Sequence, residues 1–223
     1  MKPLAAILDV DGTLVDSNYE HTRAWYRTLR EWDLTLPQAR IHKSIGMGSD
    51  QLVPHLTGWK RDDPRLEALS LARAELFQRE YLAQIRPLPG ATEFVRQLKE
   101  SGYRICLASS AKSDEVKHYT ELLAIGDLLD ETTSDQDVEA TKPAPELFDQ
   151  ACERLGVSPG AALVVGDSVW DGKAAERAGI RFVGLCTGGF SAAELREAGA
   201  VAVYAELPEV LARWDSSPFA GRF

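Results

Sequence analysis

Two carboxylates stand one residue apart near the start of the chain, directly after an apolar run. The run is Leu4 to Leu8, and Asp9 and Asp11 follow it in the segment AAILDVDGTLVDS. An apolar run that ends in turn residues is typical of a buried strand in a parallel sheet, so the two acids should lie at the edge where that strand ends. Ligands of open α/β sheets bind at this edge, which makes both acids candidates for chemistry.

Two later apolar runs also end close to polar side chains. The run at 105–108 leads directly to Ser109, and the run at 161–165 is followed closely by Asp167. Because the carboxyl ends of parallel strands share one edge of a sheet, we expect Asp9, Ser109 and Asp167 to converge.

Carboxylates that are crowded together repel one another and raise one another's pKa unless a cation lies among them. A few carboxylates, completed by water and a phosphate oxygen, are the ligands that Mg²⁺ prefers, so the pattern indicates phosphoryl chemistry. Gly12 leaves the backbone N–H groups of the turn accessible to an anion, and the hydroxyl of Thr13 can fix a carboxylate. The alternative for this Asp-x-Asp-Gly pattern is plain turn chemistry. A calcium loop does not fit, because these acids follow a strand instead of lying between two helices.

The elements that would position these side chains follow a regular alternation after Gly102. Helical faces, such as the stripe Phe148, Ala151, Cys152 and Leu155, separate short apolar runs. Besides 4–8, strands are expected at 104–108, 161–165, 181–185 and 201–203, with a weaker edge strand at 131–134. Strands that alternate with helices predict an α/β fold with a doubly wound, Rossmann-like parallel sheet.

Residues 17–87 break this alternation, because they contain long helical patterns and no convincing strand. One helical stripe runs from Trp25 to Trp32 and another from Leu66 to Phe77. We therefore predict a small all-α domain inserted after the first strand. The predicted division is an α/β core of residues 1–16 and 88–223, a helical domain of residues 17–87, and a tail at 215–223 that frays.

Composition and charge limit which partners, cellular location and cysteine chemistry the protein can have. A chain of 223 residues with 44% hydrophobic content can bury a sizeable core. The net charge of -9 argues against nucleic acid and anionic membranes as partners. No apolar stretch is long enough for a signal peptide or a membrane span, so we expect a cytoplasmic protein. For the oligomeric state, a monomer is favoured. Cys106, Cys152 and Cys186 lie far apart without metal-site spacing, and we expect buried thiols with no disulfide or zinc site.

Four motifs together resemble those of the haloacid dehalogenase superfamily, in the family's order. They are DVDGT at 9–13, LASS at 107–110, Lys142 in TKPAPELF, and GDSVWDG at 166–172. The resemblance runs from Leu4 to about Leu185. It implies a Rossmann-like core, a helical cap inserted after the first motif, Mg²⁺ as cofactor, and phosphoryl transfer through an aspartyl phosphate.

The resemblance also assigns roles to the two acids of the first motif. Asp9 would be the nucleophile that attacks phosphorus and would bind Mg²⁺ through its other oxygen. Asp11 would be the general acid that protonates the leaving alkoxide and then the base that activates water, while its backbone carbonyl binds the metal. A carboxylate held by a cation stays ionised and one that is free of it can carry a proton, so this division is physically sound.

The other motifs supply the residues around the phosphoryl group. Ser109 and Lys142 would hold the phosphoryl oxygens and neutralise charge in the transition state. Asp167 would ligate Mg²⁺ directly. Asp171 would act on the metal only through water or through another ligand.

The retained Asp11 points within the superfamily to phosphate esters, because the dehalogenases and the phosphonoacetaldehyde hydrolases do not keep this acid. A small helical cap favours small phosphorylated metabolites, of the sugar phosphate or phosphoglycolate type. One alternative is a phosphotransferase of the β-phosphoglucomutase type, which Ser49 weakens because it stands where an arginine is expected. Another is a phosphoacceptor or binding module without turnover.

Several residues are weaker candidates for phosphate or substrate binding. Two lysines, Lys43 in the helical insertion and Lys112 after the second motif, could contact a substrate anion, and a solvated lysine is the alternative for Lys43. His21 could help Asp11 to change between acid and base, or it could make only a local contact. The remaining candidates of this kind are Gly12, Thr13 and Ser110.

Overall fold

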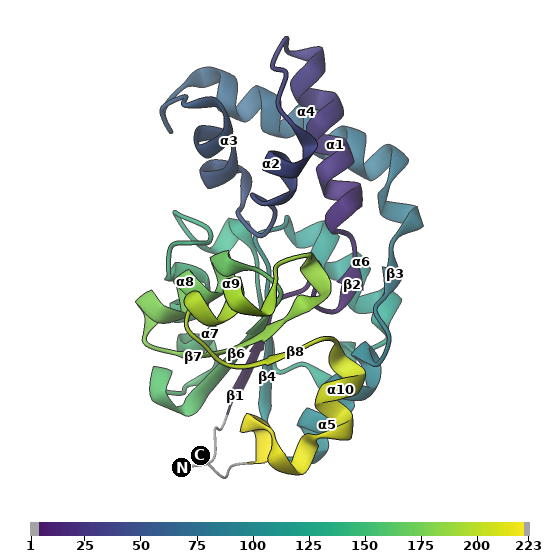
Figure 1. Ribbon diagram of the computed structural model, residues 1–223, viewed down its shortest axis with the longest axis vertical. Helices are drawn as coiled ribbons and strands as arrows, with labels where there is room; N and C mark the ends of the chain where they lie inside the picture. The colour runs from purple at the N-terminus through teal and green to yellow at the C-terminus, as the bar shows by residue number, and fades with distance from the viewer. Residues whose placement is uncertain (1–4, 221–223) are drawn as a thin grey trace.

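The computed structural model describes residues 5–220. Its centre is a parallel sheet of six strands in the order β5-β4-β1-β6-β7-β8 (Figure 1). The strands are β1 (Ala5–Leu8), β4 (Arg104–Ala108), β5 (Glu131–Thr133), β6 (Ala162–Gly166), β7 (Arg181–Leu185) and β8 (Ala200–Tyr204). The doubly wound parallel sheet predicted from the sequence is confirmed.

The order of the strands places β1 at the centre of the sheet. From β1 the chain moves outward through β4 to β5, then crosses back to β6 on the other side of β1. The direction of winding therefore reverses beside β1, and the crevice beyond its carboxyl end is where an open sheet of this kind binds ligands.

Two layers of helices cover the faces of the sheet. On one face lie α5 (Ala91–Glu100), α6 (Ser113–Leu123) and α10 (Leu207–Ala212). On the other lie α7 (Glu146–Leu155), α8 (Val169–Ala178) and α9 (Ala192–Glu197). Successive residues of β1 alternate between the two apolar clusters, because side chains of a strand point to opposite faces.

A third apolar cluster holds together a separate group of helices above the carboxyl ends of the strands (Figure 1). This group consists of α1 (Asn18–Glu31), α2 (Gln38–His42), α3 (Ser49–Thr57) and α4 (Pro64–Glu80). Trp25 and Leu69, one from each predicted helical stripe, are buried in this cluster. We call these four helices and the loops between them the helical layer.

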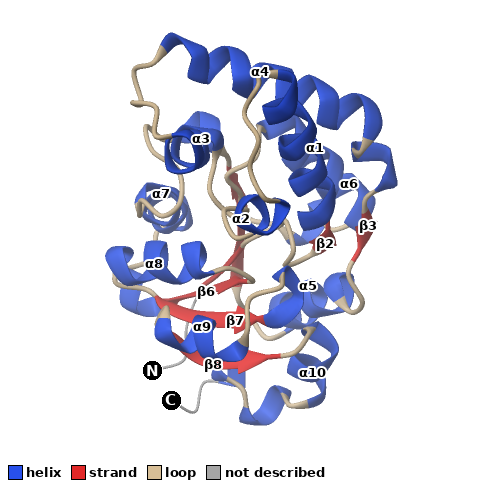
Figure 2. Cartoon of the chain, turned by 45° about the horizontal axis from the view of Figure 1, so that its top comes forward, coloured by secondary structure: helices blue, strands red, loops and turns tan. Residues whose placement is uncertain are grey.

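The chain enters and leaves the helical layer through a feature that the sequence did not indicate. Two very short strands, β2 (Val15–Asp16) and β3 (Arg86–Pro87), pair antiparallel at the edge of the layer (Figure 2). Both connections between the helical layer and the sheet therefore lie side by side.

The C-terminal segment differs from the fraying expected at 215–223. As far as Ala220 it is packed on the core: Phe219 is buried against Phe94, and its carbonyl oxygen accepts a hydrogen bond from Tyr103 Oη at 2.8 Å. Burial of an aromatic ring outweighs the entropy of the short tail. Residues 221–223 lie outside the described part of the chain.

Within residues 5–220, none of the helices has the length and apolar character needed to span a bilayer. Cys106, Cys152 and Cys186 are all free thiols; the first two are buried and the third is partly exposed.

Candidate active site

The first loop of the site begins where β1 ends. The backbone N–H of Asp9 donates to Val165 O at 2.9 Å, which continues the sheet pairing by one residue and fixes the carboxylate at the crevice. Gly12 has φ +73°, and a Cβ at this position would overlap the side chains of Asn18 and Asp167. A residue without a side chain is therefore required for the turn to bring its neighbours this close.

Asp9 shares a fully buried lysine with a second acid. The ammonium of Lys142 contacts Asp9 Oδ1 and lies 2.8 Å from Asp171 Oδ1. Burial alone would lower the pKa of Lys142, but the two carboxylates outweigh it and raise that pKa, so the lysine carries its charge. Residues of the first, third and fourth motifs thus meet in one ion-paired group.

Asp167 lies beside this group but has no cation within reach among the described residues. Its Oδ1 accepts from Thr13 Oγ1 at 3.0 Å, and its Oδ2 accepts from Asn18 Nδ2 at 2.8 Å. Burial, together with the nearby charges of Asp9 and Asp171, raises the pKa of Asp167 well above its ordinary value. Burial also raises the pKa of Asp9, to about 7, against the lowering effect of Lys142.

These three acids form a possible metal site. One carboxylate oxygen from each of Asp9, Asp167 and Asp171 lies within 4.8 Å of the others, and all three residues are buried. One lysine does not balance three carboxylates, and the donors are all hard oxygens, so the set fits a divalent cation such as Mg²⁺. All three acids also have partners in the protein. Asp9 contacts Lys142 and Thr13, Asp167 accepts from Thr13 and Asn18, and Asp171 contacts Lys142 and Ser168.

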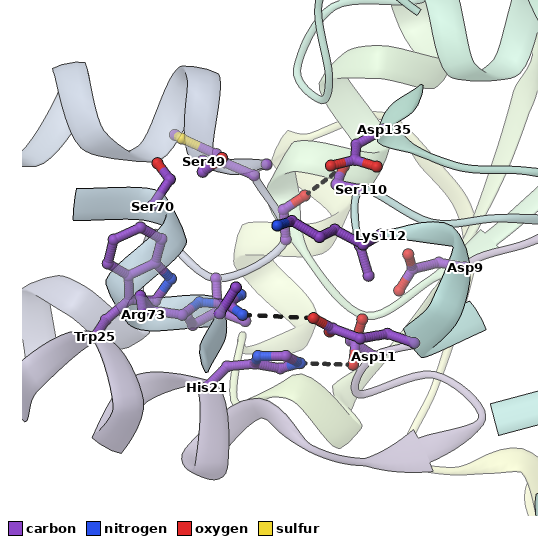
Figure 3. Close-up of a pocket in the computed structure, with 17 residues that line it drawn as sticks. Asp9, Asp11, His21, Trp25, Ser49, Ser70, Arg73, Ser110, Lys112 and Asp135 are labelled. Atoms are coloured by element: carbon purple, nitrogen blue, oxygen red, sulfur yellow. Dashed lines mark hydrogen bonds and ion pairs between the residues drawn. The ribbon is translucent and has the colours of Figure 1, made fainter. Parts of the chain in front are cut away.

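Asp11 lies on the other side of the loop and has different partners. Its Oδ1 accepts from Ser17 Oγ at 2.5 Å and is 2.9 Å from His21 Nε2 (Figure 3). Burial by itself raises the pKa of Asp11, but the charge and hydrogen bond of His21 and the hydroxyl of Ser17 outweigh it and lower the pKa to about 2. The His21 ring stacks on Phe77 of α4 at 4.0 Å, so the helical layer fixes its orientation.

The second motif lies at the end of β4. Ser109 is buried; its backbone N–H donates to Thr133 O at 3.2 Å, and its Oγ accepts from the N–H of Ala111 at 3.0 Å. Ser110 faces the helical layer, where its Oγ lies 3.5 Å from Gly46 O (Figure 3). The two serines of the motif thus have different surroundings.

A cleft of about 670 Å³, part of it open to solvent, lies above Asp9 and Asp11 between the sheet and the helical layer. Figure 3 shows side chains from both parts pointing into it. From the sheet side, the cleft is lined by Asp9, Asp11, Ser110, Lys112, Glu115 and Asp135. From the helical layer, it is lined by His21, Trp25, Ile45, Met47, Ser49, Ser70 and Arg73.

Several sequence candidates lie outside this cleft. Thr13 is fully buried beneath it, hydrogen-bonded to Asp167 and 3.2 Å from Asp9 Oδ2, so it positions carboxylates and does not face a ligand. Lys43, a weaker candidate for contact with a substrate anion, does not line the cleft and donates to Glu194 at 2.9 Å. The partner lies far along the chain, which is why the sequence alone did not reveal it.

Contacts between the helical layer and the core reach the residue that precedes Lys142. Thr141 donates through its hydroxyl and its N–H to the carboxylate of Asp50 in α3, and its Oγ1 accepts from Gly48 N at 3.0 Å. Thr141 is buried, so these bonds are shielded from water.

Replacing Thr141 by valine should therefore lower kcat/KM about tenfold. The N–H of Gly48 loses its acceptor, the carboxylate of Asp50 loses the hydroxyl donor, and Lys142 is held less firmly. Steady-state kinetics on a chromogenic phosphate ester would measure this. Thr141→Ser keeps the hydroxyl and should behave like the wild type; equal activity of Thr141→Val and Thr141→Ser would show that these bonds do not support the site.

Some residues of the site carried no recognisable signal in the sequence. Asn18 holds Asp167, although it stands only five positions after the first motif. Arg73 and Trp25 face the cleft from helices whose apolar stripes predicted only packing. For Asn18, its nearness to the first motif was a clue in the sequence. For Arg73 and Trp25 there was none, because their place in the cleft depends on how the helical layer lies over the sheet.

A family model for haloacid dehalogenase-like hydrolases matches residues 4–179, which is most of the chain. The chain belongs to this family. Membership agrees with the order of motifs and with the convergence of Asp9, Lys142 and Asp167 described above.

Individual proteins and solved structures resemble the chain over most of its length. A phosphoglycolate phosphatase of Rhodospirillum rubrum is 30% identical over 227 residues, covering 98% of this chain and 93% of that protein. A validoxylamine A 7'-phosphate phosphatase of Streptomyces hygroscopicus subsp. limoneus is 28% identical over 186 residues, covering 82% and 85%. The crystal structure of a hydrolase from Pseudomonas syringae superposes with a TM-score of 0.88 at 33% identity, covering 95% and 98%.

These similarities confirm the predicted family, the α/β fold and the enzyme class, a phosphoric monoester hydrolase. The two curated relatives named here act on chemically different phosphate esters, as their names state. Relationship to this haloacid dehalogenase-like group therefore does not by itself select a substrate.

Proposed function

We propose that the protein is a Mg²⁺-dependent phosphatase that hydrolyses small phosphorylated metabolites through an aspartyl-phosphate intermediate. The observation that carries this proposal is the pair of acids of the first motif at the floor of one cleft, in different environments. Asp9 belongs to the buried group with Lys142, whereas Asp11 is hydrogen-bonded to His21. Asp9 lies in the acid cluster, where a bound cation would keep it ionised as a nucleophile. Asp11 is hydrogen-bonded to His21, so a proton can be shared between these two groups.

In the first step, a carboxylate oxygen of Asp9 forms a bond to phosphorus as the bond from phosphorus to the alkoxide oxygen of the substrate breaks. The leaving oxygen takes a proton from the Asp11 and His21 pair. In the second step, Asp11 takes a proton from water, whose oxygen bonds to phosphorus and releases Asp9 as a carboxylate. Lys142 and Ser109 neutralise and hold the phosphoryl oxygens in both steps.

The residues present fit the metal that the mechanism requires. Asp9 and Asp167, with the backbone carbonyl of Asp11, would hold Mg²⁺, and Asp171 would orient the site through Lys142 and Ser168. Bound there, Mg²⁺ stabilises the negative charge of the phosphoryl group and offsets the repulsion between the acids.

We further propose that residues 17–87 act as a cap that excludes bulk water from the phosphoryl site. The cleft is closed on that side by the helical layer, and the layer is joined to the core by polar contacts such as Trp170 Nε1 to Lys43 O at 2.9 Å. A cleft covered in this way by the helical layer suits small metabolites better than folded protein substrates.

The proposal is tested by measuring phosphate release from p-nitrophenyl phosphate and from a sugar 1-phosphate. We expect release of inorganic phosphate, loss of this activity with EDTA, and its recovery with added Mg²⁺. The reason is that Lys142 alone does not balance the three carboxylates of Asp9, Asp167 and Asp171. Conversion of the sugar 1-phosphate into its 6-phosphate would instead identify a mutase. A phosphorylated protein that persists for minutes without releasing phosphate would identify a phosphoacceptor.

A further inference from the structure

The part of the cleft away from Asp9 holds an ion pair that joins the helical layer to the core. Arg73 of α4, which Figure 3 shows pointing into the cleft, forms this pair with Glu115 of α6; its Nη1 lies 3.7 Å from Glu115 Oε1. Both side chains are mostly buried, with 16% and 10% of their surface exposed. The guanidinium of Arg73 also lies over the rings of Trp25 and Phe77, at 5.2 and 5.3 Å.

A second pair of opposite charges lines the same region. Lys112 follows the second motif, and Asp135 begins the short 3₁₀ helix Asp135–Asp137 after β5. Burial raises the pKa of Asp135 to about 6, although Lys112 lowers it. Outside the catalytic acids and His21, the charged residues that line the cleft are therefore two cations and two acids, and their formal charges cancel.

A substrate with a carboxylate in its leaving group would bind unfavourably in this region of the cleft. The charge of Arg73 is already opposed by Glu115, and Glu115 Oε2 is buried without a hydrogen-bond partner in the described part of the chain. A new carboxylate would place like charges close together in a poorly solvated pocket. A hydroxyl group has no such cost, because it can donate to a carboxylate and accept from a guanidinium.

We propose that the Arg73 and Glu115 pair makes the enzyme selective for phosphate esters of neutral, hydroxyl-bearing alcohols and against those of hydroxy acids. The inference rests on the proposed phosphatase function and names the substrate class of that site. Ser49, Ser70 and Ser110 also line the cleft, which adds hydroxyl groups and no further charge.

Two matched pairs of substrates test the selectivity of the unmodified enzyme. Each pair replaces a carboxylate by a hydroxymethyl group: 2-phosphoglycolate with 2-hydroxyethyl phosphate, and 3-phosphoglycerate with glycerol 3-phosphate. We expect kcat/KM to be at least about tenfold higher for the neutral member of each pair, as repulsion between unit charges a few ångströms apart predicts. Equal or higher kcat/KM for the acids would overturn the inference, and so would hydrolysis of none of the four by an enzyme that releases phosphate from p-nitrophenyl phosphate. Hydrolysis of neither these four esters nor p-nitrophenyl phosphate would overturn the proposed phosphatase itself.

The variant Glu115→Gln then tests which residue is responsible. Removing this charge frees Arg73 to bind a carboxylate, so the preference for the neutral member should shrink roughly tenfold, mainly through a lower KM for the acids. Glu121→Gln, on the same helix but exposed, is the matched control and should leave the preference unchanged. If Glu115→Gln does not alter the preference for the neutral ester, the Arg73 and Glu115 pair is not its cause. This conclusion holds whatever the variant does to overall activity.

Discussion

Asp9→Asn should abolish phosphate release, lowering kcat by at least roughly a thousandfold, because an amide oxygen cannot serve as the nucleophile. The amide still accepts a hydrogen bond from Lys142, so the fold should be retained. Phosphate release measures the loss directly. A second readout is label from a radiolabelled phosphate ester, which should remain on acid-quenched wild-type protein and be absent from the variant.

Asp127→Asn is the matched control for this experiment. Asp127 is exposed and belongs to the short 3₁₀ helix Gly126–Leu128, on a different element from the catalytic loop. This variant should have wild-type activity and labelling. If Asp9→Asn retained more than about a hundredth of the activity, Asp9 would not be the nucleophile.

Asp167→Asn should produce two opposite effects, loss of activity and a more stable metal-free protein. Activity falls because the metal site loses a carboxylate that has no other cationic partner in the described part of the chain. Stability rises because the charged form of Asp167 is disfavoured in the folded state, as its raised pKa indicates. An asparagine keeps both hydrogen bonds, since its oxygen accepts from Asn18 and its amide group can donate to Thr13.

The pH dependence of this stabilisation has a defined sign. A carboxyl whose folded-state pKa is raised favours folding below its ordinary pKa of 3.8, and this contribution is lost as the pH rises through the raised value. The variant should therefore gain most at pH 8, by about 1 to 3 kcal/mol or a few degrees in Tm, and gain nothing near pH 4. Thermal unfolding in EDTA, followed at both pH values, measures the difference.

Asp171→Asn provides the contrast within the same cluster. Asp171 is paired with Lys142 and accepts hydrogen bonds from Ser168, so its charge is compensated. Removing that charge should destabilise the metal-free protein instead of stabilising it. If Asp167→Asn and Asp171→Asn shifted Tm in the same direction, charge repulsion centred on Asp167 would not explain the stability gain of Asp167→Asn.

Most of the sheet could be predicted from the sequence because its strands, apart from the polar edge strand β5, are short apolar runs that end in turn residues. The bounds of β4 and β7 match those expected, and β6 begins and ends one residue later than expected. The same logic placed Asp9, Ser109 and Asp167 at one edge, where the structure has them. Carboxyl ends of parallel strands leave little freedom in that placement.

Features that depend on the position of the helical layer could not be predicted in this way. β2 and β3 are two residues each, too short for any periodicity, and their pairing requires the chain to return after about seventy residues. The ion pair of Arg73 with Glu115 likewise joins helices whose relative placement no local pattern contains. The division into domains at residues 17 and 87 remains a prediction. The catalytic roles of the site residues are predictions that the experiments above test.

The pairing of β2 with β3 limits how the two halves of the molecule can move. Both covalent links run through one small ladder, so a rigid rotation of the helices away from the sheet has a single hinge axis at that ladder. Such a rotation would separate Lys43 from Glu194 and the Trp170 indole from its acceptor while leaving the ladder intact. The rate at which product escapes would then be governed by non-covalent bonds on the side opposite the hinge, where single substitutions can tune turnover without touching the chemistry.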